Sequence, residues 1–113
     1  MKILQEESRI ERWLGRKVES VGGIYYKFVS PGNAGVPDRL LILPDGKVWF
    51  VEIKDEKGKL SQQQIRQQNR MRATGATVYT IYGMDGARKL ADMVFRAAKS
   101  KKHRGGKGGK NGI

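Results

Sequence analysis

The chain has 113 residues, which is enough for one domain with a modest hydrophobic core. Its 23 lysine and arginine residues outnumber 11 acidic residues, and the formal charge of +12 predicts a polyanionic partner, nucleic acid ahead of a membrane surface. The sequence has no cysteine, and its single histidine, His103, lies in a Gly/Lys-rich tail; disulfides and thiolate metal sites are therefore excluded, and a zinc site or a Ser/His/Asp triad is disfavoured. No signal-peptide pattern and no apolar run of membrane-spanning length is visible, so we expect a soluble cytoplasmic protein.

The predicted elements follow from the spacing of apolar residues, glycines and prolines. In chain order they are a helix at 3–21, strands at 24–29, 38–43 and 47–54, a helix between Ser61 and Gly75, a strand at 76–82 and a helix at 85–98. Residues 99–113 combine six basic residues with five glycines and no acid. They therefore predict a flexible tail after a single domain at 1–98.

The order of these elements predicts an α/β fold with a mixed sheet. Short links, among them the turn Pro44-Asp45-Gly46, favour an antiparallel meander of the first three strands. The strand at 76–82 follows a helical crossover, so it should run parallel to the strand at 47–54. Helices are expected to flank this sheet.

Charged residues lie at the ends of two neighbouring strands, within "GVPDRLLILPDGKVWFVEIK" (35–54). Glu52 and Lys54 share one face of their strand because side chains alternate, and the intervening turn pairs residue i with about residue 90 − i, which sets Asp38 beside Glu52. Two adjacent carboxylates repel each other unless one is protonated or a cation lies between them. All-oxygen ligands without histidine favour Mg²⁺ or Mn²⁺ over zinc. The alternative is that Glu52 and Lys54 form an ordinary surface pair while Asp38 caps a loop.

Three runs of residues, "GVPDR", "FVEIK" and "GKLSQQQ", occur in this order along the chain. Together they resemble the VRR-NUC domain, a branch of the PD-(D/E)xK nuclease superfamily, and "YKFVSPGNAGVPDR" is similar to stand-alone phage and bacterial members. The resemblance covers about residues 4–84. It implies a restriction-endonuclease-like αβββαβ core, metal-dependent phosphodiester cleavage, and branched DNA such as Holliday junctions as the substrate. If a phage encodes the protein, the host-cell cytoplasm is its expected location.

The resemblance also implies roles for individual residues. Asp38, Glu52 and the backbone carbonyl of Ile53 become ligands of Mg²⁺ or Mn²⁺, and Lys54 orients the attacking water or balances charge in the transition state. Gln64 matches the family glutamine, with a solvated residue of a glutamine-rich helix as the alternative. The family also expects a glutamate on the first helix, and Glu7 lies near the centre of its apolar stripe. Glu11, toward the edge of that stripe, is the alternative, and we expect Glu6 to be solvated.

Candidate DNA-binding residues precede or follow these positions. They are Lys27, Ser30, Asn33 and Arg39 around the loop, and Arg66, Arg70 and Arg72 on the glutamine-rich helix, with the basic tail adding nonspecific affinity. A nuclease that cuts two symmetric strands needs two active sites, so we expect a homodimer, with Trp13, Trp49 and Met71 as apolar residues that a small core leaves over. Two other functions stay open, a noncatalytic DNA-binding protein with the nuclease fold and a sequence-reading restriction-type nuclease.

Overall fold

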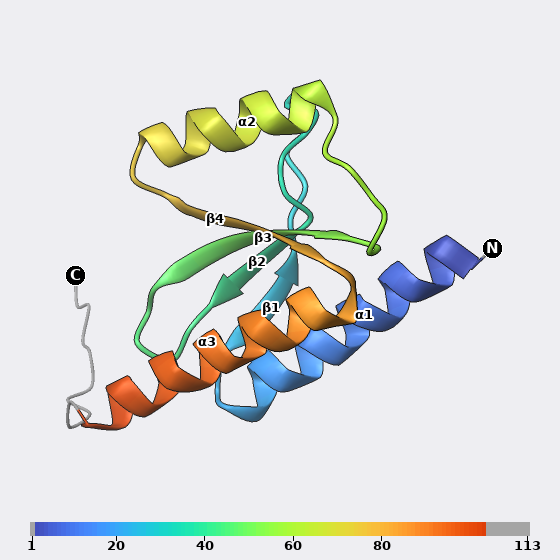
Figure 1. Cartoon of the computed structure of the whole chain (residues 1–113). Coiled ribbons are helices and arrows are strands. Elements are labelled where there is room, and N and C mark those ends of the chain that lie inside the picture. Colours follow the sequence, from blue (N-terminus) through green and yellow to red (C-terminus); the bar gives the residue numbers. More distant parts are fainter. Residues whose placement is uncertain (1, 104–113) are drawn as a thin grey trace.

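The computed structural model describes residues 2–103, with side chains described for residues 6–100. Its elements, in chain order, are α1 (Lys2–Ser20), β1 (Ile24–Lys27), β2 (Arg39–Ile42), β3 (Val48–Lys54), α2 (Gln62–Ala73), β4 (Thr77–Tyr82) and α3 (Gly83–His103). Figure 1 shows three layers, with the sheet between α2 on one side and α1 together with α3 on the other. The predicted αβββαβ core with a further helix is therefore confirmed.

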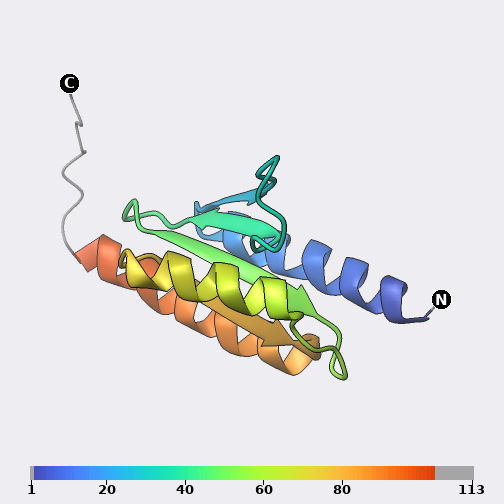
Figure 2. The same ribbon diagram turned by 90° about the horizontal axis from the view of Figure 1, so that it is seen from above.

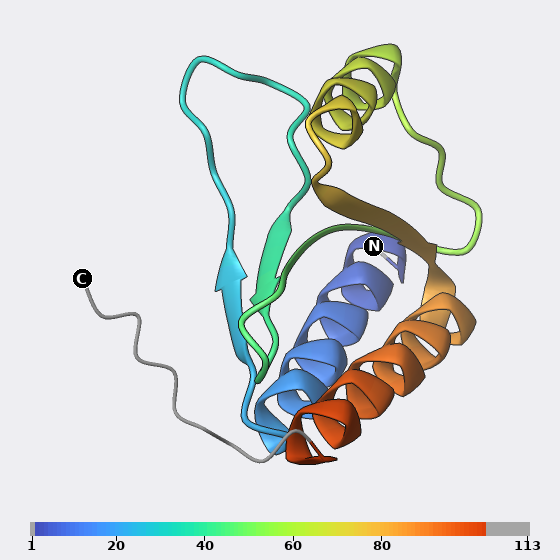
Figure 3. The same cartoon turned by 90° about the vertical axis from the view of Figure 1, so that its left-hand side faces the viewer.

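The four strands form one mixed sheet in the order β1-β2-β3-β4. The pairs β1/β2 and β2/β3 are antiparallel, whereas β3 and β4 are parallel. A parallel pair needs a crossover connection, and α2 makes this connection on the face opposite to α1 and α3, as Figure 3 shows. The predicted sheet topology is confirmed in each of its pairings.

The hydrophobic core lies between the sheet and the helices α1 and α3. The stripe on α1 places Ile10, Leu14 and Val18 in it with no exposed surface. The sheet and its connections contribute Leu41, Leu43, Trp49, Val51, Ile53 and Ile81, and α3 contributes Ala87, Leu90, Ala91 and Val94. Because side chains alternate along β3, the neighbours of Val51 and Ile53 point to the opposite face, toward α2.

The face toward α2 is only partly covered. Figure 2 shows α2 running along β4 while β1 and β2 have no helix on this side. Ile24, Tyr26 and Val48 lie on this face with exposed fractions of 42%, 55% and 40%. These three are among the large apolar residues that stay exposed, together with Val29, Ile65 and Tyr82 in the described part of the chain. The expectation for Trp49 was wrong, because that side chain lies in the core.

The ends of β1 and α3 differ from the prediction by more than one residue. β1 ends at Lys27 rather than at residue 29, although the Phe28 amide still donates to the Asp38 carbonyl at 2.7 Å. α3 continues to His103, five residues past the predicted helix end at Ala98. Lysine tolerates a helix and its charge interacts favourably with the C-terminal end of the helix dipole, so the helix extends past the last apolar residue. Residues 104–113 lie outside the described part.

Across residues 2–103, no helix has the length and apolar composition that crossing a membrane requires.

Candidate active site

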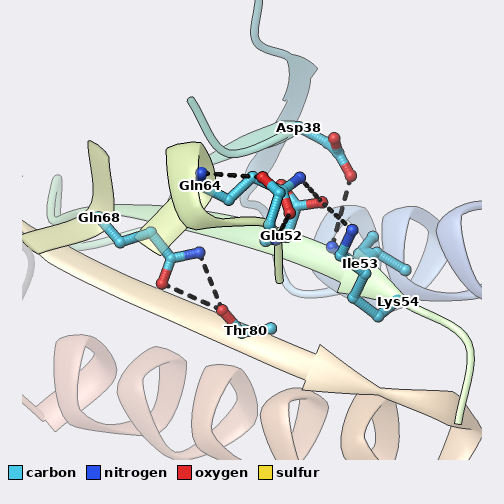
Figure 4. A network of polar contacts seen from close by, with 8 residues as sticks. Asp38, Glu52, Ile53, Lys54, Gln64, Gln68 and Thr80 are labelled. Atoms are coloured by element: carbon cyan, nitrogen blue, oxygen red, sulfur yellow. Dashed lines mark hydrogen bonds and ion pairs between the residues drawn. The ribbon is translucent and has the colours of Figure 1, made fainter. Parts of the chain in front are cut away.

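Asp38 and Glu52 lie side by side where β2 begins and β3 ends. The register pairs Arg39 with Val51, so the preceding residue of β2 falls opposite the following residue of β3, as the turn length predicted. The Asp38 carboxylate accepts a hydrogen bond from the Ile53 amide at 3.4 Å, as Figure 4 shows. The two acidic side chains therefore meet at one end of the sheet, on the face toward α2.

Glu52 is the most deeply buried acidic side chain of this site, with 3% of its surface exposed. Its Oε2 atom lies 3.6 Å from the Lys54 ammonium and accepts a hydrogen bond from the Gln64 amide at 3.2 Å. Burial raises the pKa of Glu52 to about 7, and the charge of Asp38 adds to this effect, while Lys54 opposes it. Among the described residues, none donates a hydrogen bond to the buried Oε1 atom.

The Asp38 carboxyl group is also perturbed. Burial raises its pKa, and the hydrogen bond from the Ile53 amide lowers it again in part. Amide and carbonyl of one strand residue point to the same neighbouring strand, so the Ile53 carbonyl faces β2 as its amide does. The geometry is compatible with Ile53 contributing an oxygen beside Asp38.

Gln64 reaches this site from the first turn of α2. Ser61 is the N-cap, and its hydroxyl accepts from the Gln64 backbone amide at 3.0 Å. In return the Gln64 side-chain oxygen accepts from the Ser61 amide at 2.9 Å. This capping box fixes which end of the side-chain amide faces Glu52, namely the donating NH₂ group.

The two candidate glutamates of α1 have different surroundings. Burial raises the pKa of Glu7, and its carboxylate interacts with the Asp55 amide and with the charges of Lys54 and Asp38. Glu11 instead forms an ion pair with Arg39 at 3.1 Å. Glu7 therefore faces the candidate site, whereas Glu11 is engaged on the other face of β2. Glu6, expected to be solvated, is half-buried.

The loop before Asp38 is held against the start of α2. Gly35 has φ +92°, and an added Cβ there would lie 2.8 Å from the Gln63 carbonyl oxygen. Both observations favour glycine at this position. The Gln67 side chain also donates to the Ala34 carbonyl at 3.3 Å. The glycine of "GVPDR" thus permits a close approach that brings the Asp38 loop and the Gln64 turn together.

A solved structure described as a VRR_NUC domain superposes on this chain with a TM-score of 0.72 and 36% sequence identity. The match covers 77% of this chain and 95% of that structure. The chain belongs to the VRR-NUC family. A second structure, described as a VRR_NUC domain protein, has a TM-score of 0.62 at 13% identity over 81% of this chain and 86% of its own, and shows the fold alone.

A curated relative from Acyrthosiphon pisum secondary endosymbiont phage 1 is named "Putative nuclease p44". It is 46% identical over 85 residues, which are 75% of this chain and 90% of the relative. No protein-family model matches the sequence. The VRR-NUC assignment therefore comes from the solved structure, and the phage relative independently carries a nuclease name.

The VRR-NUC resemblance implies a divalent cation, and the residues present fit one. Glu52 offers a buried oxygen without a hydrogen-bond donor, and Asp38 and the Ile53 carbonyl supply further oxygens on the same side. Hard oxygen donors of this kind suit Mg²⁺ or Mn²⁺. Among the side chains that the structure describes, those of residues 6–100, no three acidic, histidine or cysteine groups lie closely enough together to hold an ion by themselves. A backbone oxygen, water or substrate would have to complete the coordination.

The predicted DNA-binding residues are not equivalent in the structure. Lys27, Arg66 and Arg70 are exposed, and Asn33 donates to the Ser30 hydroxyl at 2.9 Å within the loop. Arg39 is held by Glu11, and its guanidinium lies 5.1 Å from the centre of the Tyr25 ring. Contact of Arg39 with DNA stays a prediction, and its observed contacts are with protein.

Two groups of residues were missed from the sequence. Arg12 and Arg16, one turn apart on α1, line a hollow of about 350 Å³ together with Arg39. Their spacing beside Glu11 was the available signal. Gln68 was the other omission, hidden among five glutamines of one helix. Arg72, whose contact with DNA stays a prediction, donates to the Gln68 side chain at 3.1 Å and to the Val78 carbonyl at 2.9 Å.

Proposed function

We propose that this VRR-NUC protein is an endodeoxyribonuclease that requires Mg²⁺ or Mn²⁺ and hydrolyses phosphodiester bonds in branched DNA, such as a four-way junction. One observation carries the proposal. Asp38 and Glu52 lie next to each other, and the buried Oε1 atom of Glu52 has no hydrogen-bond donor among the described residues. Repulsion between these groups costs stability in the absence of a cation. Such a cost is typical of residues kept for function rather than stability.

The chain's own residues have separable roles in this proposal. Asp38 and Glu52 hold the cation, and Gln64 fixes the Glu52 carboxylate through its NH₂ group. Lys54, with 18% of its side chain exposed, lies close enough to orient a water molecule or to balance charge on the scissile phosphate. Glu7 is the further acid beside Lys54. When bound, the divalent cation polarises the phosphate and lowers the pKa of a nearby water.

The DNA backbone would follow the basic residues around this site. Lys27 on β1 and Arg66 and Arg70 on α2 are exposed and free to contact phosphates, and Arg12 with Arg16 adds positive charge on α1. Affinity set by phosphate contacts falls with salt concentration, in proportion to the number of contacts. Cleavage in the cytoplasm of a phage-infected host is the setting that the phage relative supports.

A homodimer is part of the proposal. Ile24, Tyr26 and Val48 form an apolar area on the uncovered face of the sheet, which supports association with a second copy. Replacing Tyr26 and Val48 together by lysine should give a monomer in sedimentation equilibrium, with its circular dichroism unchanged. A wild-type protein that sediments as a monomer at micromolar concentration would remove this part.

The test of catalysis uses a panel of labelled DNA structures with and without Mg²⁺ or Mn²⁺. Wild-type protein should cut the branched members, and Asp38→Asn and Lys54→Ala should bind them without cutting. The matched controls are Asp92→Asn on α3 and Lys47→Ala in the turn before β3, both at exposed positions, the lysine at the opposite end of β3 from Lys54. Binding without cleavage by the wild type under every metal condition would favour a noncatalytic DNA-binding protein instead.

A further inference from the structure

The attachment of α2 to the sheet is unusual because it is polar. Within α2, all of whose residues the structure describes, Gln68 is the one buried residue, with 2% of its surface exposed. Ile65, an apolar residue of the same helix, is 40% exposed. A helix ordinarily docks through an apolar stripe, and a buried amide is costly unless its hydrogen bonds are made.

The hydrogen bonds of Gln68 are made to the neighbouring strand. Its NH₂ group and its oxygen lie 3.0 Å and 3.2 Å from the Thr80 hydroxyl, which can accept from one and donate to the other. The Arg72 guanidinium donates to the same Gln68 oxygen at 3.1 Å and to the Val78 carbonyl at 2.9 Å. These contacts fasten the middle of α2 to β4.

The same helix carries Gln64 one turn earlier. Thr80 is the partner of Glu52 in the parallel β3/β4 ladder, so the two side chains lie next to each other on the face toward α2. Residues four apart lie on one side of a helix, and Gln64 and Gln68 therefore contact these two neighbours in parallel, as Figure 4 shows. A shift of α2 along the sheet would break both contacts together.

We infer that Gln68 and Thr80 are positioning residues, which fix α2 at the place where the Gln64 NH₂ group holds Glu52. The inference rests on the proposed function for its catalytic consequence, but the geometric part concerns the metal-free protein. The capping box orients the Gln64 amide within α2, and the Gln68–Thr80 pair orients α2 on the sheet. The second pair carries this task because Gln68 is the one residue of α2 that is buried against the sheet.

The first test is structural and needs no metal. In the metal-free protein labelled with ¹⁵N, the side-chain NH₂ signals of Gln64 report its hydrogen bond to Glu52. Gln68→Met and Thr80→Val, which keep shape and remove the polar contact, should move these signals to positions typical of a free amide. Thr80→Ser, which keeps the hydroxyl, should leave the signals at their wild-type positions. Gln62→Met, the same change as Gln68→Met at an exposed position of α2, should also leave them there.

The second test is kinetic and uses a DNA that the wild type cuts. Gln68→Met should lower kcat by about 10-fold to 100-fold, the range seen when residues that support a metal ligand are removed, while KM stays within about twofold. The double variant Gln64→Met/Gln68→Met should be no slower than Gln64→Met alone, because Gln68 acts through Gln64. Losses that multiply would instead assign Gln68 an independent role.

Either test can overturn the inference separately from the proposed function. Unchanged Gln64 signals in a folded Gln68→Met protein would refute the positioning role whatever the enzyme does. A wild type that cuts no DNA would remove the proposed function, while displaced signals would still support the geometric part. Equal effects of Gln62→Met and Gln68→Met would show a general disturbance of the helix and would also overturn the inference.

Discussion

The two faces of the sheet contact their helices through different kinds of residue. The face toward α1 and α3 is closed by aliphatic residues such as Leu14 and Val94, each without exposed surface. The face toward α2 instead carries Glu52, Lys54 and Thr80, joined to the helix by glutamines. The first face supplies most of the stability, and it leaves the second free to hold charges that oppose folding.

The largest expected difference between the faces is in activity. Glu52→Gln keeps the shape of the side chain and its contact with Gln64, but removes the negative charge that binds a cation. Cleavage of branched DNA should fall by about 1000-fold, or roughly 4 kcal/mol of activation free energy, in single-turnover assays. The unfolding free energy at pH 8 should stay equal or rise. A variant that is both inactive and unfolded would contradict the comparison.

Leu14→Ala is the counterpart on the apolar face. Its side chain is fully buried, so truncation should lower the unfolding free energy by about 3 kcal/mol in urea denaturation. The affinity for DNA per folded molecule should not change, because this residue lies in the core away from the charged face. A loss below about 1 kcal/mol would mean that this face contributes less than its packing indicates.

The stability of the metal-free protein should depend on pH through Glu52. Its pKa is raised from 4.5 to about 7 by burial and by Asp38, so the folded state holds this proton more tightly than the unfolded state. The protonated Glu52 therefore stabilises the folded state in full below pH 4.5, and this stabilisation is lost as the pH rises through 7. Between pH 5 and pH 8 the unfolding free energy should fall by about 2.5 kcal/mol from this group.

The matched measurement is denaturation of Glu52→Gln at pH 5 and pH 8. In this variant, the decrease in unfolding free energy that Glu52 causes should be absent. Adding Mg²⁺ at pH 8 should stabilise the wild type, since a ligand that binds only the folded state raises its stability. Equal pH dependence of the two proteins would assign the effect to other groups.

The smallest effect should come from an apolar residue on the polar face. Ile65 is 40% exposed, so Ile65→Ala should lower the unfolding free energy by no more than about 1 kcal/mol, mainly through lost partial burial. Thermal denaturation beside Leu14→Ala gives the direct comparison. A cost as large as that of Leu14→Ala would show that α2 docks through apolar contacts after all.

Much of the fold and part of the candidate site could be read from local patterns. The turn Pro44-Asp45-Gly46 fixes the pairing of β2 with β3, and this register brings Asp38 to Glu52. Alternation then puts Lys54 on the same face. The start of α2 was predicted at Ser61, a residue type that caps helices, whereas its capping box with Gln64 was seen only in the structure. Alternation also sends Tyr25 and Tyr26 to opposite faces of β1, where Tyr25 packs against Gly15 and Tyr26 is exposed.

Other features depend on contacts between distant segments. The ion pair of Arg39 with Glu11, which comes from another element, could not be predicted from the residues around either one. Arg72 likewise binds β4, and α3 continues beyond the last residue of its apolar stripe. No local pattern separates Gln68 from its neighbouring glutamines, because its burial depends on the position of Thr80.

The sequence by itself determined the order of elements, the hairpin register and the three charged residues at the end of the sheet, because periodicity, turns and alternation act over a few neighbouring residues. Only the tertiary structure decided which polar side chains are buried and what they bind. Burial and pairing are properties of elements brought together from distant parts of the chain, and they distinguish Gln68 from Gln62 and Glu7 from Glu11.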